Sequence, residues 1–170
     1  MEFLTWLEQT ELSLWLRESD WGHPIVLCFH AVGMGIVVGV SLMFSARVLG
    51  YSKDFPLAAF DKLFAIAWYG FAMNAVSGVL LYVGEPRRLL LTPAFFIKMI
   101  LIVLAGLSVW VLTKALHGME SSPAAVGAGH RAEVVTTGAK IAAVFPILLW
   151  IGAIIAGRLI GYTIPPPPPP

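Results

Sequence analysis

Four long apolar segments, separated by short stretches rich in polar residues, proline and glycine, dominate the pattern along this chain. A helix needs about 20 mostly apolar residues to cross a bilayer. This pattern predicts four spanning helices, over residues 24–48, 63–83, 94–116 and 138–162. Pro146 is expected to kink the fourth, because proline removes a hydrogen bond from the helix interior.

The two ends of the chain follow different patterns. Over residues 2–20, apolar positions mix with glutamates, which predicts an amphipathic helix lying flat in the membrane interface. Trp6, Trp15 and Trp21 would then lie at headgroup depth; a helix packed on the outside of the bundle is the alternative. The prolines 165–170 predict a stiff extended tail after a single membrane domain, 1–164.

The loops predict the topology. The turn 85–88 is short, so the second and third spans are expected to be antiparallel neighbours, whereas 117–137 is the longest loop. Six Lys and Arg residues belong to the side after spans one and three, against three on the other side when Lys98 and Arg158, inside spans, are discounted. By the positive-inside rule, the N- and C-termini are expected on the periplasmic side of a bacterial inner membrane.

Composition supports an all-α integral membrane four-helix bundle. Hydrophobic residues make up 58% of the chain and charged residues 12%, the latter about half the share usual in soluble domains. The net charge of +1 is too small to indicate a nucleic-acid-binding protein. One cysteine, Cys28, rules out an intrachain disulfide. We find no nucleophile with a base, phosphate loop or paired carboxylates, so no catalytic residue is assigned.

One titratable side chain, His30, lies in the outer half of the first span. Ionisable groups inside a membrane are costly and by default suggest function. Four antiparallel spans would place Lys98 and Arg158 at a similar depth, a turn or two below the same surface, with Asn74 deeper. The sequence therefore predicts a pocket formed by these four residues.

A b-type haem suits such a pocket, because it needs an imidazole on iron, a flat apolar slot and cations for its propionates. We predict His30 as the metal ligand, with Lys98 and Arg158 near the propionates and Asn74 in the same site. Glycine strips on spans one, two and four would form the slot. The sixth position on iron is either empty or filled by one of three residues: Met73, Met99 or Lys98.

Other interpretations stay open. His30 and Met34 together could hold copper, since thioethers select copper(I). A histidine in a membrane helix can also be a structural donor to a backbone carbonyl, and Asn74 an interhelical hydrogen bond. Lys98 and Arg158 could only extend to the surface. The glycine faces would then pack helices within an accessory subunit of a membrane complex or a homo-oligomer.

Several motifs support a resemblance that covers nearly the whole chain. They are His30…Arg47-Val48-Leu49-Gly50, Trp68-x-Gly70-Phe71…Ser77-Gly78, Pro93-Ala94-Phe95-Phe96-Ile97-Lys98-Met99 and Leu149-Trp150…Gly157-Arg158-Leu159-Ile160. In these the chain resembles a bacterial inner-membrane family known as a domain of unknown function. More distantly, it is similar to the haem-b-binding HemJ oxidases and the copper-linked CopD proteins. That similarity implies His30 as a haem ligand and Lys98 as its essential neighbour.

Overall fold

Seven helices account for the regular structure of the residues described by the computed structural model, namely 2–51, 55, 59–120 and 136–163. They are α1 (Glu2–Glu8), α2 (Glu11–Glu18), α3 (Gly22–Leu49), α4 (Phe60–Gly84), α5 (Pro86–Leu90), α6 (Pro93–Glu120) and α8 (Thr137–Thr163). Most of the expected loop 117–137 and the proline tail lie outside the described residues.

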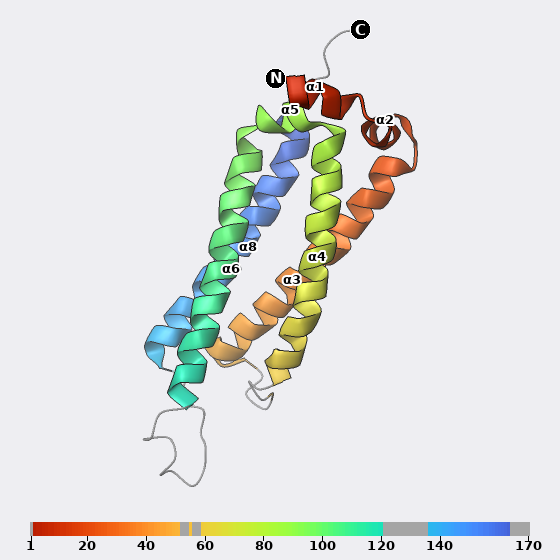
Figure 1. Cartoon of the computed structure of the whole chain (residues 1–170). Helices are drawn as coiled ribbons and strands as arrows, with labels where there is room; N and C mark the ends of the chain where they lie inside the picture. The colour runs from red at the N-terminus through yellow and green to blue at the C-terminus, as the bar shows by residue number, and fades with distance from the viewer. Residues whose placement is uncertain (1, 52–54, 56–58, 121–135, 164–170) are drawn as a thin grey trace.

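The four long helices α3, α4, α6 and α8 are each long and apolar enough to cross a membrane. They run side by side along one axis (Figure 1). The predicted all-α fold with four spans is thereby confirmed, and the chain is a multi-pass membrane protein. Helix α8 continues through Pro146, whose side chain is fully buried.

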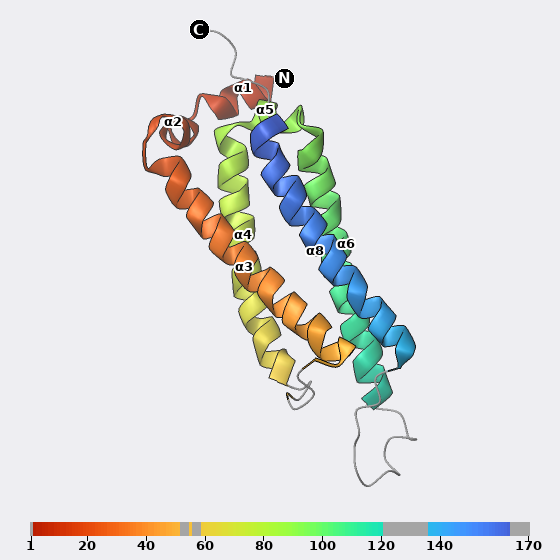
Figure 2. The same cartoon turned by 180° about the vertical axis from the view of Figure 1, so that it is seen from behind.

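The spans pack as two helical hairpins. Helix α3 packs along α4 and α6 along α8, and contacts between α3 and α8 join the two hairpins (Figures 1 and 2). In the described part of the chain, α4 and α6 are not closely packed along their lengths. Near α5, the rings of Tyr82 and Phe95 stack with centroids 6.1 Å apart. Spans two and three were expected to be neighbours, and in the structure they approach each other only near α5.

Helices α3 and α4 approach each other closely at a pair of glycines, Gly33 and Gly70. A Cβ atom on Gly33 would lie 2.7 Å from the carbonyl oxygen of Gly70. On Gly35 or Gly39, a Cβ would meet no atom of the structure within 4 Å. Since each helical residue turns by about 100°, Gly33 and Gly35 point in nearly opposite directions. The glycine strip predicted on span one thus faces away from the other spans. Gly70 packs against α3, which matches the alternative in which the glycine faces only pack helices.

Among the described residues, the buried core contains two apolar clusters. One, at the C-terminal end of α3, is centred on Phe44, Val48 and Phe60. The other, nearer mid-span, joins α3, α6 and α8 through Val38, Ala105, Trp150 and Ala153. Many large apolar side chains on the four spans are exposed, as lipid-facing residues must be, because hydrocarbon solvates them.

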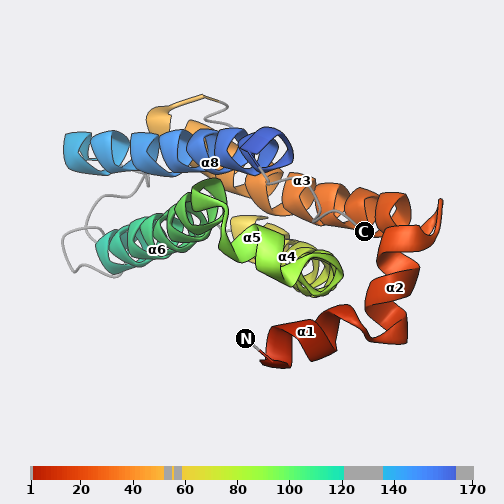
Figure 3. The same cartoon turned by 90° about the horizontal axis from the view of Figure 1, so that it is seen from above.

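The N-terminal segment forms two helices where a single helix was expected. Thr10 separates them, since its side chain accepts a hydrogen bond from the Ser13 amide and caps α2; serine and threonine favour this position. Both helices lie at the α5 end of the bundle, on the side of α4 (Figures 1 and 3). Trp6, Trp15 and Trp21 are exposed, as an interfacial position requires.

Candidate functional site

His30 is tied to α4 by a reciprocal pair of hydrogen bonds. Its Nδ1 lies 3.0 Å from the carbonyl oxygen of Asn74, and the Asn74 side-chain amide donates to the His30 carbonyl oxygen at 2.7 Å. The Ser77 hydroxyl lies 3.2 Å from the same Nδ1. A Cβ on Gly78 would lie 3.2 Å from Cε1 of the ring, so the glycine lets the imidazole approach α4 closely. Asn74 is therefore at the depth of His30, whereas the sequence predicted it deeper.

These contacts decide which ring nitrogen carries the hydrogen. A carbonyl oxygen can only accept a hydrogen bond. Nδ1 is therefore the donor toward Asn74, and Nε2 of the neutral ring keeps its lone pair. Ser77 is compatible with this tautomer, because its hydroxyl donates to the Met73 carbonyl oxygen at 2.7 Å and can accept from Nδ1.

The second hairpin brings Lys98 to the other ring nitrogen. The Lys98 Nζ lies 3.3 Å from Nε2 of His30, within reach for the amine to donate to the lone pair. The lysine stem runs beside Gly157 of α8, where a Cβ would lie 3.5 Å from its Cδ and Cε. Side chains or backbone of all four spans thus meet around one partly buried imidazole. The predicted association of His30, Asn74 and Lys98 is present in the structure.

Arg158 does not join this group. Its side chain is exposed, and its guanidinium lies over the ring of Tyr162 at 5.6 Å. Arg158 follows Gly157, which lies beside the Lys98 side chain, so the depth of Arg158 matches the expectation. Its side chain, however, points away from the imidazole. A long cationic side chain near a helix end can reach the membrane surface this way.

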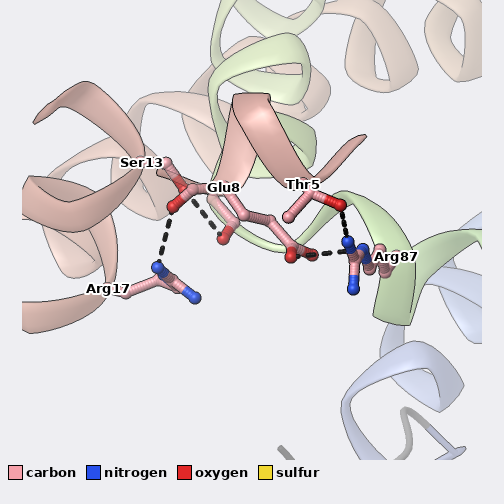
Figure 4. A network of polar contacts seen from close by, with 6 residues as sticks. Thr5, Glu8, Ser13, Arg17 and Arg87 are labelled. Carbon is pink, nitrogen blue, oxygen red and sulfur yellow. Dashed lines mark hydrogen bonds and ion pairs between the residues drawn. The ribbon is translucent and has the colours of Figure 1, made fainter. Parts of the chain in front are cut away.

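The rim arginines bind neighbouring acidic groups. Arg88 pairs with Glu85 within the same turn. Arg87 bonds to the Thr5 hydroxyl, and its Nε lies 3.3 Å from the Glu8 carboxylate. Figure 4 shows this network, in which Arg17 also donates to the Glu8 carbonyl oxygen at 2.9 Å. Arg87 therefore joins α5 to α1, whereas Arg88 pairs within its own turn.

The sulfur ligands considered from the sequence lie elsewhere. Met34 packs against the mid-span cluster around Val38 and Trp150. Met73 lines an open apolar groove of about 400 Å³ between α3 and α4, on the Ser77 side of the imidazole. Met99 is 41% exposed. The described residues hold no group of three or more His, Cys, Asp and Glu side chains placed to bind a metal ion.

Sequence reasoning missed Ser77 and Gly78 as neighbours of the imidazole. Both lie one turn after Asn74, at i+3 and i+4, and so share its face of the helix. This spacing could have identified them. The contact between Arg87 and Glu8 joins segments that are far apart in the chain, so no comparable spacing in the sequence could have predicted it.

Fold and site together define a multi-pass α-helical membrane protein in which a histidine and a lysine meet between two helical hairpins. Comparison with protein-family models, with curated proteins and with solved structures found no match to this chain.

Proposed function

We propose that this protein is a b-type haem-binding protein of a bacterial inner membrane, involved in redox reactions or electron transfer. His30 would bind the iron through Nε2. The observation that supports the proposal is the state of Nε2, which keeps its lone pair because Nδ1 donates to the Asn74 carbonyl oxygen. Histidines that bind metals usually donate their other ring hydrogen to a carbonyl or carboxylate, which fixes the tautomer and the ring orientation.

The surroundings of Nε2 suit an iron porphyrin better than a bare ion. A metal bound only by protein needs several convergent ligands, and the described residues offer no cluster of them. A porphyrin brings four nitrogens of its own, so axial protein ligands suffice. When bound, haem would supply one-electron chemistry. The chain would supply the imidazole, positioned by the Asn74 carbonyl oxygen and the Ser77 hydroxyl of α4.

An absorption spectrum of the purified protein tests this proposal. We expect a Soret band that is lost in His30→Ala and retained in His23→Ala, a control seven residues earlier on α3 with an exposed side chain. Circular dichroism and elution volume should be unchanged in both variants. Elemental analysis separates iron from copper held by His30. A colourless protein after haem supplementation, with neither metal bound, would refute the proposal.

The orientation is part of the same proposal. Helices α1, α2 and α5 and the C-terminal end of α8 lie at one end of the bundle (Figures 1 and 2). The Lys and Arg distribution supports a periplasmic location for this end. Alkaline phosphatase fused to the C-terminus should therefore be active in cells, and a fusion within the 121–135 segment inactive. The reverse pattern would refute this orientation.

A second candidate function is an accessory role in a homo-oligomer or larger membrane complex, favoured by the outward-facing glycines of α3. A Cβ atom added to Gly35 or Gly39 would meet no described atom within 4 Å, and small residues let another helix approach closely in a membrane. Gly39→Leu should then lower the oligomeric mass measured by light scattering. An unchanged mass for Gly39→Leu, with wild type monomeric, would exclude self-association through this face.

A further inference from the structure

Lys98 directs its amine at the opposite hairpin. Its Nζ on α6 lies 3.3 Å from Nε2 of His30 on α3. In the described part of the chain, Lys98 makes no ion pair with a carboxylate. An ammonium group inside a membrane span is costly without a counter-charge. This position therefore favours the neutral amine, whose nitrogen has two hydrogens and one lone pair.

Three neighbouring groups have the arrangement of an activated nucleophile. In that arrangement, a nucleophile lies within hydrogen-bond reach of a base and a third group orients the base; the first distance is often longer when no substrate is bound. Here the Lys98 amine faces the Nε2 lone pair of His30 at 3.3 Å, and the Asn74 carbonyl oxygen holds Nδ1 at 3.0 Å. By donating one hydrogen to Nε2, the amine keeps its own lone pair free to attack an electrophile.

We propose that Lys98 is a nucleophilic amine that forms an imine with an apolar aldehyde from the bilayer, and that His30 is its base. The nitrogen lone pair attacks the carbonyl carbon and forms the C–N bond, while one electron pair of the C=O bond moves to oxygen. Nε2 takes a hydrogen from the nitrogen as a proton and passes it to that oxygen. Loss of the second nitrogen hydrogen together with the hydroxyl group releases water and leaves the C=N bond. Nothing is oxidised or reduced.

The aldehyde approaches Lys98 from the lipid. Lys98 is itself partly exposed, and its neighbours Ile97 and Met99 are 52% and 41% exposed. On the α8 side, a Cβ on Gly157 would lie 3.6 Å from Nζ, so this glycine presents no side chain to the amine. No group has to fit between His30 and Lys98, because the carbonyl carbon needs to contact only Nζ. A molecule that reaches this depth has to dissolve among acyl chains, which selects a hydrocarbon or isoprenoid aldehyde.

This inference goes beyond haem binding and does not rest on it. Iron on Nε2 would occupy the lone pair that the amine uses, because a neutral imidazole has one acceptor nitrogen. The reaction therefore belongs to the haem-free protein. The Soret band reports on the first proposal and modification of Lys98 on the second, so the two can fail separately.

The test uses the full haem-free chain in detergent, with decanal as the aldehyde and cyanoborohydride to trap the imine. Peptide mass spectrometry then identifies the modified lysine. Lys114 is the internal control, because it lies on the same helix with its amine over Trp110 and is exposed, so accessibility alone favours Lys114. A positioned base contributes at least about 10²-fold, and Lys98 should be modified faster than Lys114 by about this factor.

His30→Asn separates the base from the packing contact. The new amide can donate to the Asn74 carbonyl oxygen in place of Nδ1, but it has no counterpart of Nε2. Modification of Lys98 should fall by about 10²-fold, while modification of Lys114 and the circular dichroism spectrum stay unchanged. His23→Ala should match wild type.

The comparison of Lys98 with Lys114 in wild type does not depend on any variant. A Lys98 rate no greater than the Lys114 rate would overturn this inference, as would a Lys98 rate unchanged in His30→Asn. Either result leaves haem binding through His30 intact. Rapid modification of Lys98 in a chain that binds no haem would support this inference and refute haem binding alone.

Discussion

Gly33→Ala tests the helix crossing that positions the site. The added Cβ would lie 2.7 Å from the carbonyl oxygen of Gly70 and 2.8 Å from the amide nitrogen of Asn74. Both atoms belong to backbone, so they cannot turn aside as a flexible side chain would. Helices α3 and α4 must separate by several tenths of an ångström, and such overpacking costs about 1–3 kcal/mol.

Two controls isolate this cost. Gly35→Ala, on the same helix, and Gly106→Ala, on α6, introduce the same atom where a Cβ would meet no atom of the structure within 4 Å. All three substitutions gain the same helix propensity, about 1 kcal/mol, so this gain cancels in the comparison. We expect Gly33→Ala to be less stable than either control by about 1–3 kcal/mol.

The free energy of unfolding can be measured by titrating SDS into detergent micelles and following tryptophan fluorescence. Each variant should first be shown to be monodisperse. All variants should then be compared at equal protein concentration, because Gly35 lies on the face proposed above for contacts between protomers. Equal stability of Gly33→Ala and Gly106→Ala would mean that α3 and α4 do not cross at this point. The position of Asn74 beneath His30 would then have to be reconsidered.

Three smaller perturbations follow from the same structure. Asn74→Leu removes the amide donor to the His30 carbonyl and should cost about 0.6 kcal/mol, and no more than about 1.7, in the same titration. Ser45→Ala should stabilise the protein by about 1 kcal/mol, because this buried hydroxyl has no hydrogen-bond partner among the described residues; lower stability would contradict this. Arg87→Gln breaks the contact with Glu8 and should change global stability by less than about 1 kcal/mol. It should nevertheless speed trypsin cleavage in α2, measured by mass spectrometry, and an unchanged rate would mean that this contact does not hold the N-terminal helices.

The spans could be predicted from the sequence because hydropathy records contact with lipid directly. Every observed span begins within three residues of the expected position, the largest difference being 60 against 63. The division of the N-terminal segment into α1 and α2 could also have been foreseen. Thr10 followed by Glu11 and Ser13 has the composition of a capped helix start.

Helix faces were harder to predict than helix depths. A repeat of small residues indicates that a face is smooth, but it does not indicate which helix lies against it. Gly70 therefore packs against α3 and Gly78 against the His30 ring, whereas Gly35 and Gly39 face no other span of the structure. The same limit applies to the cations: Lys98 and Arg158 have the expected depths, but only Lys98 points toward His30.

The structure also changes the choice between a structural and a ligand-binding histidine. From the sequence, these were alternatives for His30. In the structure, they belong to different nitrogens of one ring: Nδ1 joins α3 to α4 through the Asn74 carbonyl, and Nε2 faces Lys98 on α6. The first contact fixes the tautomer that leaves the second nitrogen its lone pair. A hydrogen bond to the backbone is therefore no evidence against ligation, and the environment of Nε2 is what discriminates between the two roles.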